Sequence, residues 1–127
     1  QIPGVEAVLA TLVKTHQMAI VTTSRRTDFN LIHQRRNITH YMDFVLARED
    51  YKKSKPDPEP YLAGLERFDA HPQECLVVED SQRGLQAAIA AGIDCAIVHN
   101  AFTAGQNFSG ARYRITSLAE LPGVLSA

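Results

Sequence analysis

The sequence predicts an α/β fold in which a mainly parallel sheet lies between helices. Short apolar runs alternate along the chain with longer segments whose apolar residues recur at helical spacing. The short runs are continuously apolar rather than alternating, which is typical of strands that are buried on both faces. Helices on both sides of a parallel sheet give a three-layer core.

The first helix and the first strand are predicted by the opening residues. Apolar residues at helical spacing over 4–15 predict a helix. The continuous apolar run 18–21 predicts a buried strand. This strand ends at the polar triplet Thr22-Thr23-Ser24, so its carboxyl end presents hydroxyl groups.

The middle of the chain continues the alternation. Sparse apolar residues among arginines predict a surface helix over 27–36, and the apolar run 44–47 predicts the second strand. A polar stretch follows, after which Pro58 and Pro60 open the next helix, because two prolines this close suit only a first turn.

The last part of the chain contains the remaining strands and helices. The run 75–78 predicts a third strand, which ends at Glu79-Asp80-Ser81 and is followed by a helix that Gly92 terminates. Three further segments are predicted as a fourth strand, a short edge strand and a turn of helix: 95–98, 113–115 and 118–121.

Composition limits the class of protein. The 127 residues fit one domain spanning 1–127. A formal net charge of -1 gives no basic excess for general binding to nucleic acid or acidic membranes. No apolar run approaches the roughly 20 residues that a membrane span needs. Cys75 and Cys95 each lie in an apolar run, so we expect them to be core residues of a reducing compartment, in a cytoplasmic protein.

Polar side chains follow the predicted strands at the edge where parallel sheets bind ligands. Thr22 follows the first strand, Lys55 lies in the loop after the second, and Glu79 with Asp80 follows the third. A hydroxyl and a lysine bind phosphate oxygens, and carboxylates hold Mg²⁺. The sequence therefore predicts a site for a phosphate and a divalent metal.

Each of these residues also has a purely structural interpretation. Thr22 suits an ordinary turn, Lys55 a solvated loop, and Asp80 or Ser81 the first position of a helix. Glu79 is harder to explain in this way, because a carboxylate at the inner end of a buried run is costly unless a cation compensates it. The prediction of a site depends on the convergence of all these residues.

Three segments carry a more specific pattern. They are Thr22 closing an apolar strand, Ser54-Lys55-Pro56-Asp57-Pro58 with Tyr61 beyond it, and Val77-Val78-Glu79-Asp80-Ser81 followed by Gly84, Ala87, Ala88, Ala91 and Gly92. They resemble the second, third and fourth motifs of the haloacid dehalogenase-like hydrolases, and most of all the branch of β-phosphoglucomutase and its small-metabolite phosphatases. The resemblance covers about residues 3–100. It implies a Rossmann-like core and gives Gly84 a part in shaping the turn at the helix start.

The resemblance also implies roles at the matching positions. Thr22 would hydrogen-bond the transferring phosphoryl group, and Thr23 would supply neighbouring contacts. Lys55 would pair with the phosphate and the nucleophile, while Glu79 and Asp80 would support Mg²⁺, Asp80 more directly. The implied activity is that of a Mg²⁺-dependent phosphatase that acts on a small phosphorylated metabolite through a phospho-aspartyl intermediate.

The sequence departs from the family at its first motif. That motif is a buried strand ending in Asp-x-Asp, whose first Asp attacks phosphorus and whose second is the general acid/base. No Asp-x-Asp occurs in this sequence. In the family a helical cap follows the motif, and Ile2-Pro3-Gly4-Val5 resembles the point where the chain returns to the core. We therefore expect a truncated hydrolase that lacks its first strand, nucleophile and cap and is inactive alone.

The missing strand has a structural consequence. In the family it occupies the centre of the sheet, between the strand ending at Thr22 and the strand ending at Glu79. Without it, both strands would present unpaired backbone groups. We expect the chain either to pair these strands directly or to recruit another chain, which would make it self-associate.

Other classes of protein also contain residues of these types. A response-regulator receiver domain also uses acids, a Thr and a Lys, but its acids precede the Thr and Lys. The order here is Thr22, Lys55 and then the acids, which rules strongly against that class. A phosphomutase stays open, as does a non-catalytic module that binds phosphate or a partner. The substrate cannot be named, because selectivity in the family depends largely on the cap.

Overall fold

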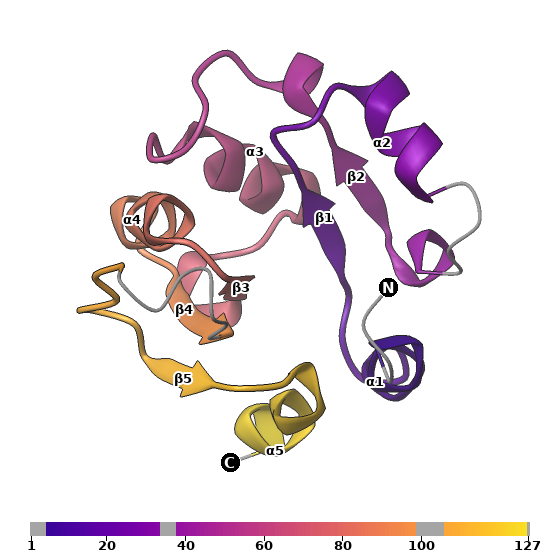
Figure 1. Ribbon diagram of the computed structural model, residues 1–127, viewed down its shortest axis with the longest axis vertical. Coiled ribbons are helices and arrows are strands. Elements are labelled where there is room, and N and C mark those ends of the chain that lie inside the picture. Colours follow the sequence, from indigo (N-terminus) through magenta and orange to yellow (C-terminus); the bar gives the residue numbers. More distant parts are fainter. Residues whose placement is uncertain (1–4, 34–37, 99–105, 127) are drawn as a thin grey trace. The chain divides into compact units, whose positions relative to one another are not determined.

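The computed structural model describes residues 5–33, 38–98 and 106–126. Residues 1–4, which include most of the predicted return point, lie outside this description. The chain divides into two compact units, Gln1–Lys52 with Leu118–Ala127 and then Lys53–Ser117 (Figure 1). Each unit is described by itself, and the prediction of one domain over 1–127 stays a prediction.

The first unit contains a two-stranded parallel sheet. Its helices and strands are α1 (Val5–Leu12), β1 (Ala19–Val21), α2 (Arg26–His33), β2 (Phe44–Leu46) and α5 (Leu121–Ser126), with short 3₁₀ helices at Thr39–Tyr41, Arg48–Asp50 and Leu118–Glu120. Strands β1 and β2 are parallel, with Ile20 opposite Val45. Helix α1 buries Val8 and Leu12 and packs against α5.

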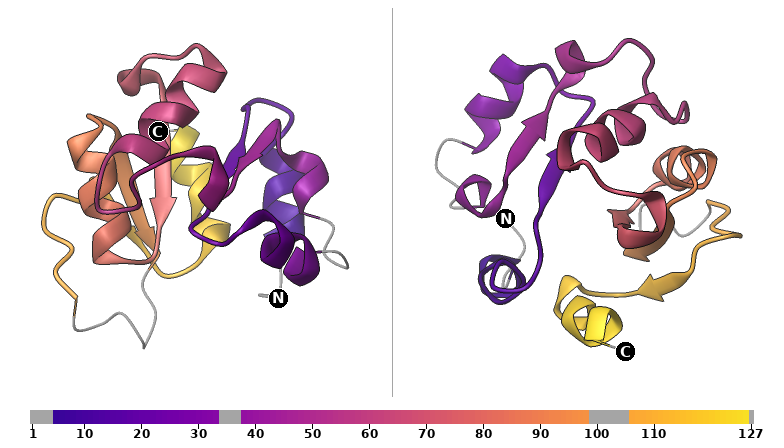
Figure 2. Two further views of the ribbon diagram at one scale, coloured as in Figure 1. Left: turned by 90° about the horizontal axis from the view of Figure 1, so that it is seen from above. Right: turned by 180° about the vertical axis from the view of Figure 1, so that it is seen from behind.

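The second unit contains a three-stranded parallel sheet in the order β3-β4-β5. Its elements are α3 (Glu59–Phe68), a 3₁₀ helix at Pro72–Glu74, β3 (Leu76–Glu79), α4 (Gln82–Ala90), β4 (Asp94–Val98) and β5 (Tyr113–Ile115). Helix α4 packs on β3 and β4, as the orange segments in Figure 2 show. Besides Pro60 on α3, the most deeply buried residues of this unit lie on α4 and β4: Leu85, Ala87, Ala88, Cys95, Ala96 and Ile97.

Local sequence signals determine where the two helices of the second unit begin and end. Pro58 precedes α3, and Asp69 closes it with a left-handed backbone, φ 53°. Ser81 caps the start of α4, since its hydroxyl accepts a hydrogen bond from Gly84 N at 3.1 Å. Gly92, with φ 78°, follows the end of α4 as the sequence predicts.

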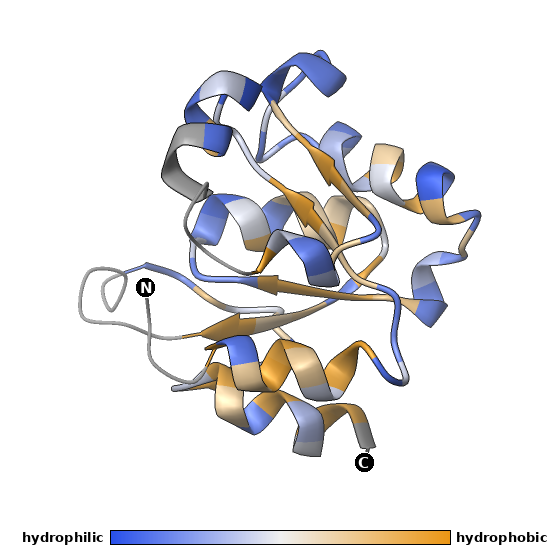
Figure 3. Cartoon of the chain, turned by 90° about the vertical axis from the view of Figure 1, so that its right-hand side faces the viewer, coloured by the Kyte–Doolittle hydropathy of each residue, from blue (hydrophilic) through white to orange (hydrophobic). Residues whose placement is uncertain are grey.

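The predicted alternation of helices and parallel strands is confirmed. The strands are hydrophobic along most of their length (Figure 3). Full burial on both faces holds for the centre of β4 but is wrong for β1, whose three residues are only partly buried, and for Val78 of β3, which is 39% exposed. The physical reason is that β1 pairs only with β2, and β3 only with β4, within the described residues.

The 3₁₀ helices at Thr39–Tyr41, Arg48–Asp50 and Pro72–Glu74 were not predicted from the sequence, because three residues are too short to show a helical period of apolar residues. Within the part of the chain that the structure describes, no helix is long and apolar enough to cross a membrane.

Candidate active site

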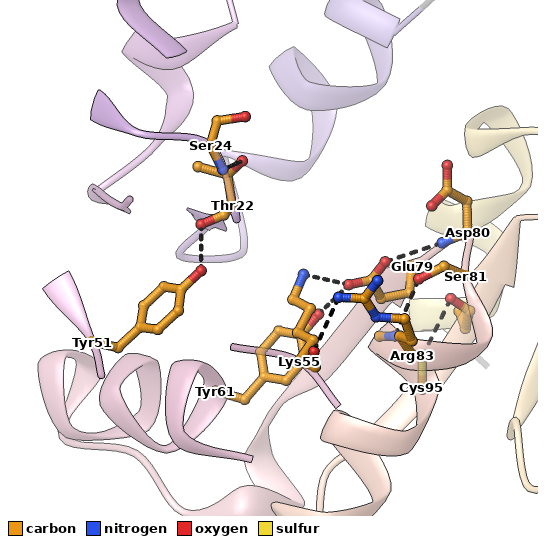
Figure 4. Close-up of polar contacts among 12 residues, drawn as sticks. Thr22, Ser24, Tyr51, Lys55, Tyr61, Glu79, Asp80, Ser81, Arg83 and Cys95 are labelled. Atoms are coloured by element: carbon orange, nitrogen blue, oxygen red, sulfur yellow. Dashed lines mark hydrogen bonds and ion pairs between the residues drawn. The ribbon is translucent and has the colours of Figure 1, made fainter. Parts of the chain in front are cut away.

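Three side chains of the second unit meet at the end of β3. Glu79 Oε2 accepts a hydrogen bond from Lys55 Nζ at 2.5 Å and another from Tyr61 OH at 2.5 Å (Figure 4). Lys55 lies in the loop before α3, and Tyr61 lies in the first turn of α3. The Lys55 and Glu79 side chains are only 12% and 11% exposed. The pairing therefore compensates two charges that have largely left water.

Lys55 is held by more than its ion pair. Its Nζ lies 5.0 Å from the centroid of the Tyr61 ring, within the range of a cation–π contact. Its backbone carbonyl accepts a hydrogen bond from Arg83 Nη2 at 3.3 Å. The loop that carries Lys55 is thus attached to the start of α4, while its ammonium is attached to β3 and α3.

Gly84 provides the space in which the Glu79 carboxyl group lies. A Cβ atom built on Gly84 would overlap Glu79 Cδ, Oε2 and Cγ. Gly84 is the third residue of α4, so the helix approaches the carboxylate at the one position that has no side chain. The resemblance gave Gly84 a part in shaping the turn, and this close approach adds a second reason for glycine there.

Asp80 follows Glu79 but is placed differently. It is exposed, its backbone N donates to Glu79 Oε1 at 3.3 Å, and its carboxylate points away from Glu79 in Figure 4. No group of three or more His, Cys, Asp or Glu in the described ranges could hold a metal ion. Mg²⁺ commonly takes one or two protein carboxylates, with water and substrate phosphate as its other ligands. The carboxylates of Glu79 and Asp80 do not converge on one point here, so their part in binding Mg²⁺ stays a prediction.

Both cysteines are free and have raised pKa values. Burial raises the pKa of the Cys95 thiol to about 12, the negative charge of Glu79 acts in the same direction, and Lys55 opposes it. Burial, with a smaller contribution from Glu74, also raises the pKa of Cys75. A neutral thiol is a poor nucleophile and a poor metal ligand, so neither cysteine has the properties of a reactive thiol.

Thr22 and Thr23 belong to the first unit, where Thr22 follows β1 as predicted. Thr22 N donates to Leu46 O at 2.9 Å, and Thr22 O accepts from the buried Tyr51 OH at 2.8 Å. Thr22 Oγ1 accepts from Ser24 N at 3.1 Å, and its proton has no acceptor in the described part of the chain. The Thr22 hydroxyl can therefore donate to a ligand, and Thr23 is exposed beside it.

Three contacts of the predicted residues, one in the first unit and two in the second, were missed by the sequence reasoning. Tyr61 was placed on the apolar face of its helix, Tyr51 was left in a polar stretch, and Arg83 was given no role. A buried tyrosine hydroxyl needs a hydrogen-bond partner, which is the signal that marks Tyr51 and Tyr61. The partner itself could not be read, because Tyr61 and Glu79 are 18 residues apart in the sequence.

The structure combines parallel strands, covering helices and a mostly buried Lys55–Glu79 pair at a strand end, and comparison with known proteins identifies the family. The sequence model described as haloacid dehalogenase-like hydrolase matches residues 1–98. This chain belongs to that family. The resemblance stated from the sequence motifs is confirmed.

Three similar proteins illustrate the match. The phosphorylated carbohydrates phosphatase of Thermotoga maritima is 36% identical over 93 residues, which cover 72% of this chain and 43% of that protein. The structure of a Thermotoga maritima protein assigned as a β-phosphoglucomutase has a TM-score of 0.87 at 30% identity, covering 98% of this chain and 59% of the other. The structure of CbbY from Rhodobacter sphaeroides in complex with phosphate has a TM-score of 0.84 at 27% identity, and the match covers 94% of this chain and 55% of the other.

These comparisons confirm the Rossmann-like α/β fold class and place the chain among phosphatase-like and phosphomutase-like relatives. The chain spans only about half the length of these relatives, from 43% to 59%. The activity, substrate and partners of the whole protein are therefore matters for proposal.

Proposed function

We propose that this chain is the core part of a Mg²⁺-dependent phosphatase that hydrolyses a small phosphorylated metabolite. The observation that carries the proposal is the mostly buried Lys55–Glu79 pair at the carboxyl end of β3, next to the exposed Asp80. A lysine paired with one carboxylate, with the exposed carboxylate of Asp80 next in the sequence, suits the binding of a phosphate together with a divalent cation. The phosphorylated carbohydrates that name the Thermotoga maritima relative are one class of candidate substrate.

Each predicted residue has a part in the proposed reaction. The Thr22 hydroxyl donates to an oxygen of the transferring phosphoryl group, and Thr23 contributes neighbouring contacts. Lys55 offsets the negative charge of that group, while Asp80 and Glu79 would hold Mg²⁺, with Asp80 the more direct ligand. When bound, Mg²⁺ would supply electrostatic stabilisation of the phosphoryl charge.

The nucleophile of the proposed reaction is an aspartate that this sequence does not contain. Its carboxylate oxygen would form a bond to phosphorus as the bond to the leaving oxygen breaks, and that oxygen would take a proton from the second acid of an Asp-x-Asp motif. Water would then hydrolyse the phospho-aspartyl group and release inorganic phosphate. The motif would have to come from sequence upstream of Gln1.

Hydrolysis of p-nitrophenyl phosphate in the presence of Mg²⁺ tests this proposal. We expect no turnover by the 127-residue chain and clear turnover by the chain extended upstream through an Asp-x-Asp motif. In the extended protein, Lys55→Ala should lower kcat/KM by at least about 100-fold, because the charge of the phosphoryl group is no longer offset. Turnover by the short chain that disappears in Lys55→Ala would show that the nucleophile is not missing.

Two alternatives follow from the same residues. A phosphomutase is favoured by the structural similarity to the Thermotoga maritima protein assigned as a β-phosphoglucomutase. Isomerisation of a sugar phosphate without release of inorganic phosphate would support it. A non-catalytic module would bind phosphate or Mg²⁺ in calorimetry and show no turnover in any extended form.

We also infer a cytoplasmic setting and the absence of nucleic-acid or membrane partners. Two free cysteines support a reducing compartment. The near-neutral formal charge of -1 supports the absence of broad electrostatic binding to polyanions.

A further inference from the structure

We propose that Tyr61 is a positioning residue that holds the Lys55 ammonium group in place through the carboxylate of Glu79. The purpose of this arrangement, the presentation of Lys55 to a phosphate, rests on the proposed function. The arrangement itself rests on the contacts of three side chains in the second unit, Lys55, Tyr61 and Glu79 (Figure 4).

The first step of the argument concerns the Glu79 carboxylate. The terminal torsion of a glutamate side chain is broad, so the carboxyl group turns easily unless its oxygens are held. Tyr61 OH and Lys55 Nζ both donate to the same oxygen, Oε2, at 2.5 Å. The Tyr61 hydroxyl therefore selects the oxygen that faces Lys55. Gly84 has no side chain and so leaves the space in which the Glu79 carboxyl group lies.

The second step concerns the Tyr61 ring. The ring is buried, with 8% of the residue exposed, and its centroid lies 5.0 Å from Lys55 Nζ. One residue thus donates a hydrogen bond to the anion and offers its aromatic face to the cation. Phenylalanine would keep the ring and lose only the hydroxyl, whereas leucine would lose both contacts, so the two contributions can be separated.

The third step concerns the lysine. A lysine has a flexible four-carbon stem, and its ammonium is a compact charge that many geometries can satisfy. Held on one carboxylate oxygen and against one ring, it occupies a single place before any ligand arrives. Such preorganisation matters for stabilising charge in a transition state, because the group does not have to reorganise during the reaction.

Nuclear magnetic resonance of the lysine side-chain nitrogens in the 127-residue chain tests the proposal. The Lys55 Nζ signal is assigned by its loss in Lys55→Arg, and the exposed Lys14 and Lys53 provide references for mobile lysines. We expect a high order parameter for Lys55. In Tyr61→Phe it should fall at least halfway toward the values of the references, and in Tyr61→Leu it should fall further.

A matched control and a second variant complete the experiment. Tyr113→Phe removes a tyrosine hydroxyl of the same unit that contacts Arg112, and it should leave the Lys55 signal unchanged. A Tyr61→Phe protein with native circular dichroism and an unchanged Lys55 order parameter would overturn the proposal. If Tyr61→Phe does not fold, the Lys55 order parameter is measured in Glu79→Gln instead. An unchanged Lys55 order parameter in folded Glu79→Gln would also overturn the proposal.

The readout involves no turnover, so it separates this proposal from the proposed function. A mobile Lys55 in Tyr61→Phe supports the positioning role even if the extended protein has no phosphatase activity. An active extended protein in which Tyr61→Phe leaves Lys55 ordered and kcat unchanged would retain the phosphatase and reject the positioning role. If both proposals hold, Tyr61→Phe in the extended protein should lower kcat about 10-fold with KM nearly unchanged, because the loss falls on the transition state.

Discussion

Glu79 carries a negative charge at a mostly buried position, and three neighbours determine where that charge lies. Lys55 and Tyr61 donate to one of its oxygens, and Gly84 leaves the space that the carboxyl group fills. Removal of one partner from a buried ion pair commonly costs about 3–5 kcal/mol, because the remaining charge is left uncompensated. The position of this side chain is therefore sensitive to small changes in the residues around it.

Gly84→Ala should destabilise the chain although alanine favours helices. Alanine gains up to about 1 kcal/mol of helix propensity over glycine. The added Cβ overlaps a carboxyl group that cannot move aside without losing Lys55 or Tyr61, and overpacking of this kind costs about 1–3 kcal/mol. We expect a net loss of about 1–2 kcal/mol in the free energy of unfolding, measured by urea denaturation.

Gly123→Ala is the matched control for this substitution. Gly123 also lies in a helix, α5, but within the described residues the position of its Cβ has no atom within 4 Å other than its chain neighbours and the backbone of its own helix. This variant should be neutral or slightly stabilising. Equal stabilities of the two alanine variants would show that the Glu79 carboxyl group is not confined by Gly84.

At the scale of one residue, the sequence predicted which groups belong to the candidate site but not how they contact one another. Lys55 and Glu79 were both predicted as site residues, from their places after strands. Their direct ion pair was not predicted, because it joins residues 24 positions apart through a loop of unknown course. Tyr61 was predicted as an apolar helix residue. Only the structure shows that its hydroxyl also donates a hydrogen bond to the mostly buried Glu79.

Helix α4 is the element that ties the site to the fold of the second unit. It begins directly after Asp80, packs on β3 and β4, and carries Gly84 at its third position. The hydrogen bond from Gly84 N to Ser81 Oγ fixes its first turn. Apolar spacing, Ser81 and Gly92 were enough to predict this helix, because each end has its own local signal.

Ser81→Ala should weaken the start of α4. The substitution leaves Gly84 N without its side-chain acceptor, and loss of such a cap costs about 1 kcal/mol. Ser81→Asp should retain most of the stability, because an aspartate at this position accepts the same hydrogen bond. Thermal unfolding followed by circular dichroism measures both, and no difference between Ser81→Ala and Ser81→Asp would contradict the capping role.

At the scale of the whole molecule, each unit has a sheet whose outer strands pair on one side only within the described residues. Strand β3 lies at one edge of its sheet, and Val78 within it is 39% exposed. Exposed apolar edge strands without a charge or proline are prone to pair with other chains. Apolar composition alone predicted that β1 and β3 are buried on both faces, whereas the absence of the first motif predicted that both strands would lack a neighbour on one side.

We propose that the isolated chain self-associates through such edges. Size-exclusion chromatography with light scattering should show a mass above that of the monomer, increasing with protein concentration. Val78→Lys should shift the chain toward the monomer, because a charge on an edge strand opposes pairing. Leu62→Lys, which replaces another exposed apolar residue, on α3, serves as control and should have little effect. A monomeric mass at every concentration would contradict self-association.

The buried thiol of Cys95 has a consequence for the resistance of this site to oxidants. Peroxides react with thiolates, and burial raises the pKa of the Cys95 thiol to about 12, so the thiol is almost entirely neutral at pH 7. Cys95 also has only 1% of its surface exposed. We therefore expect Cys95 to react only slowly with peroxides while the protein is folded.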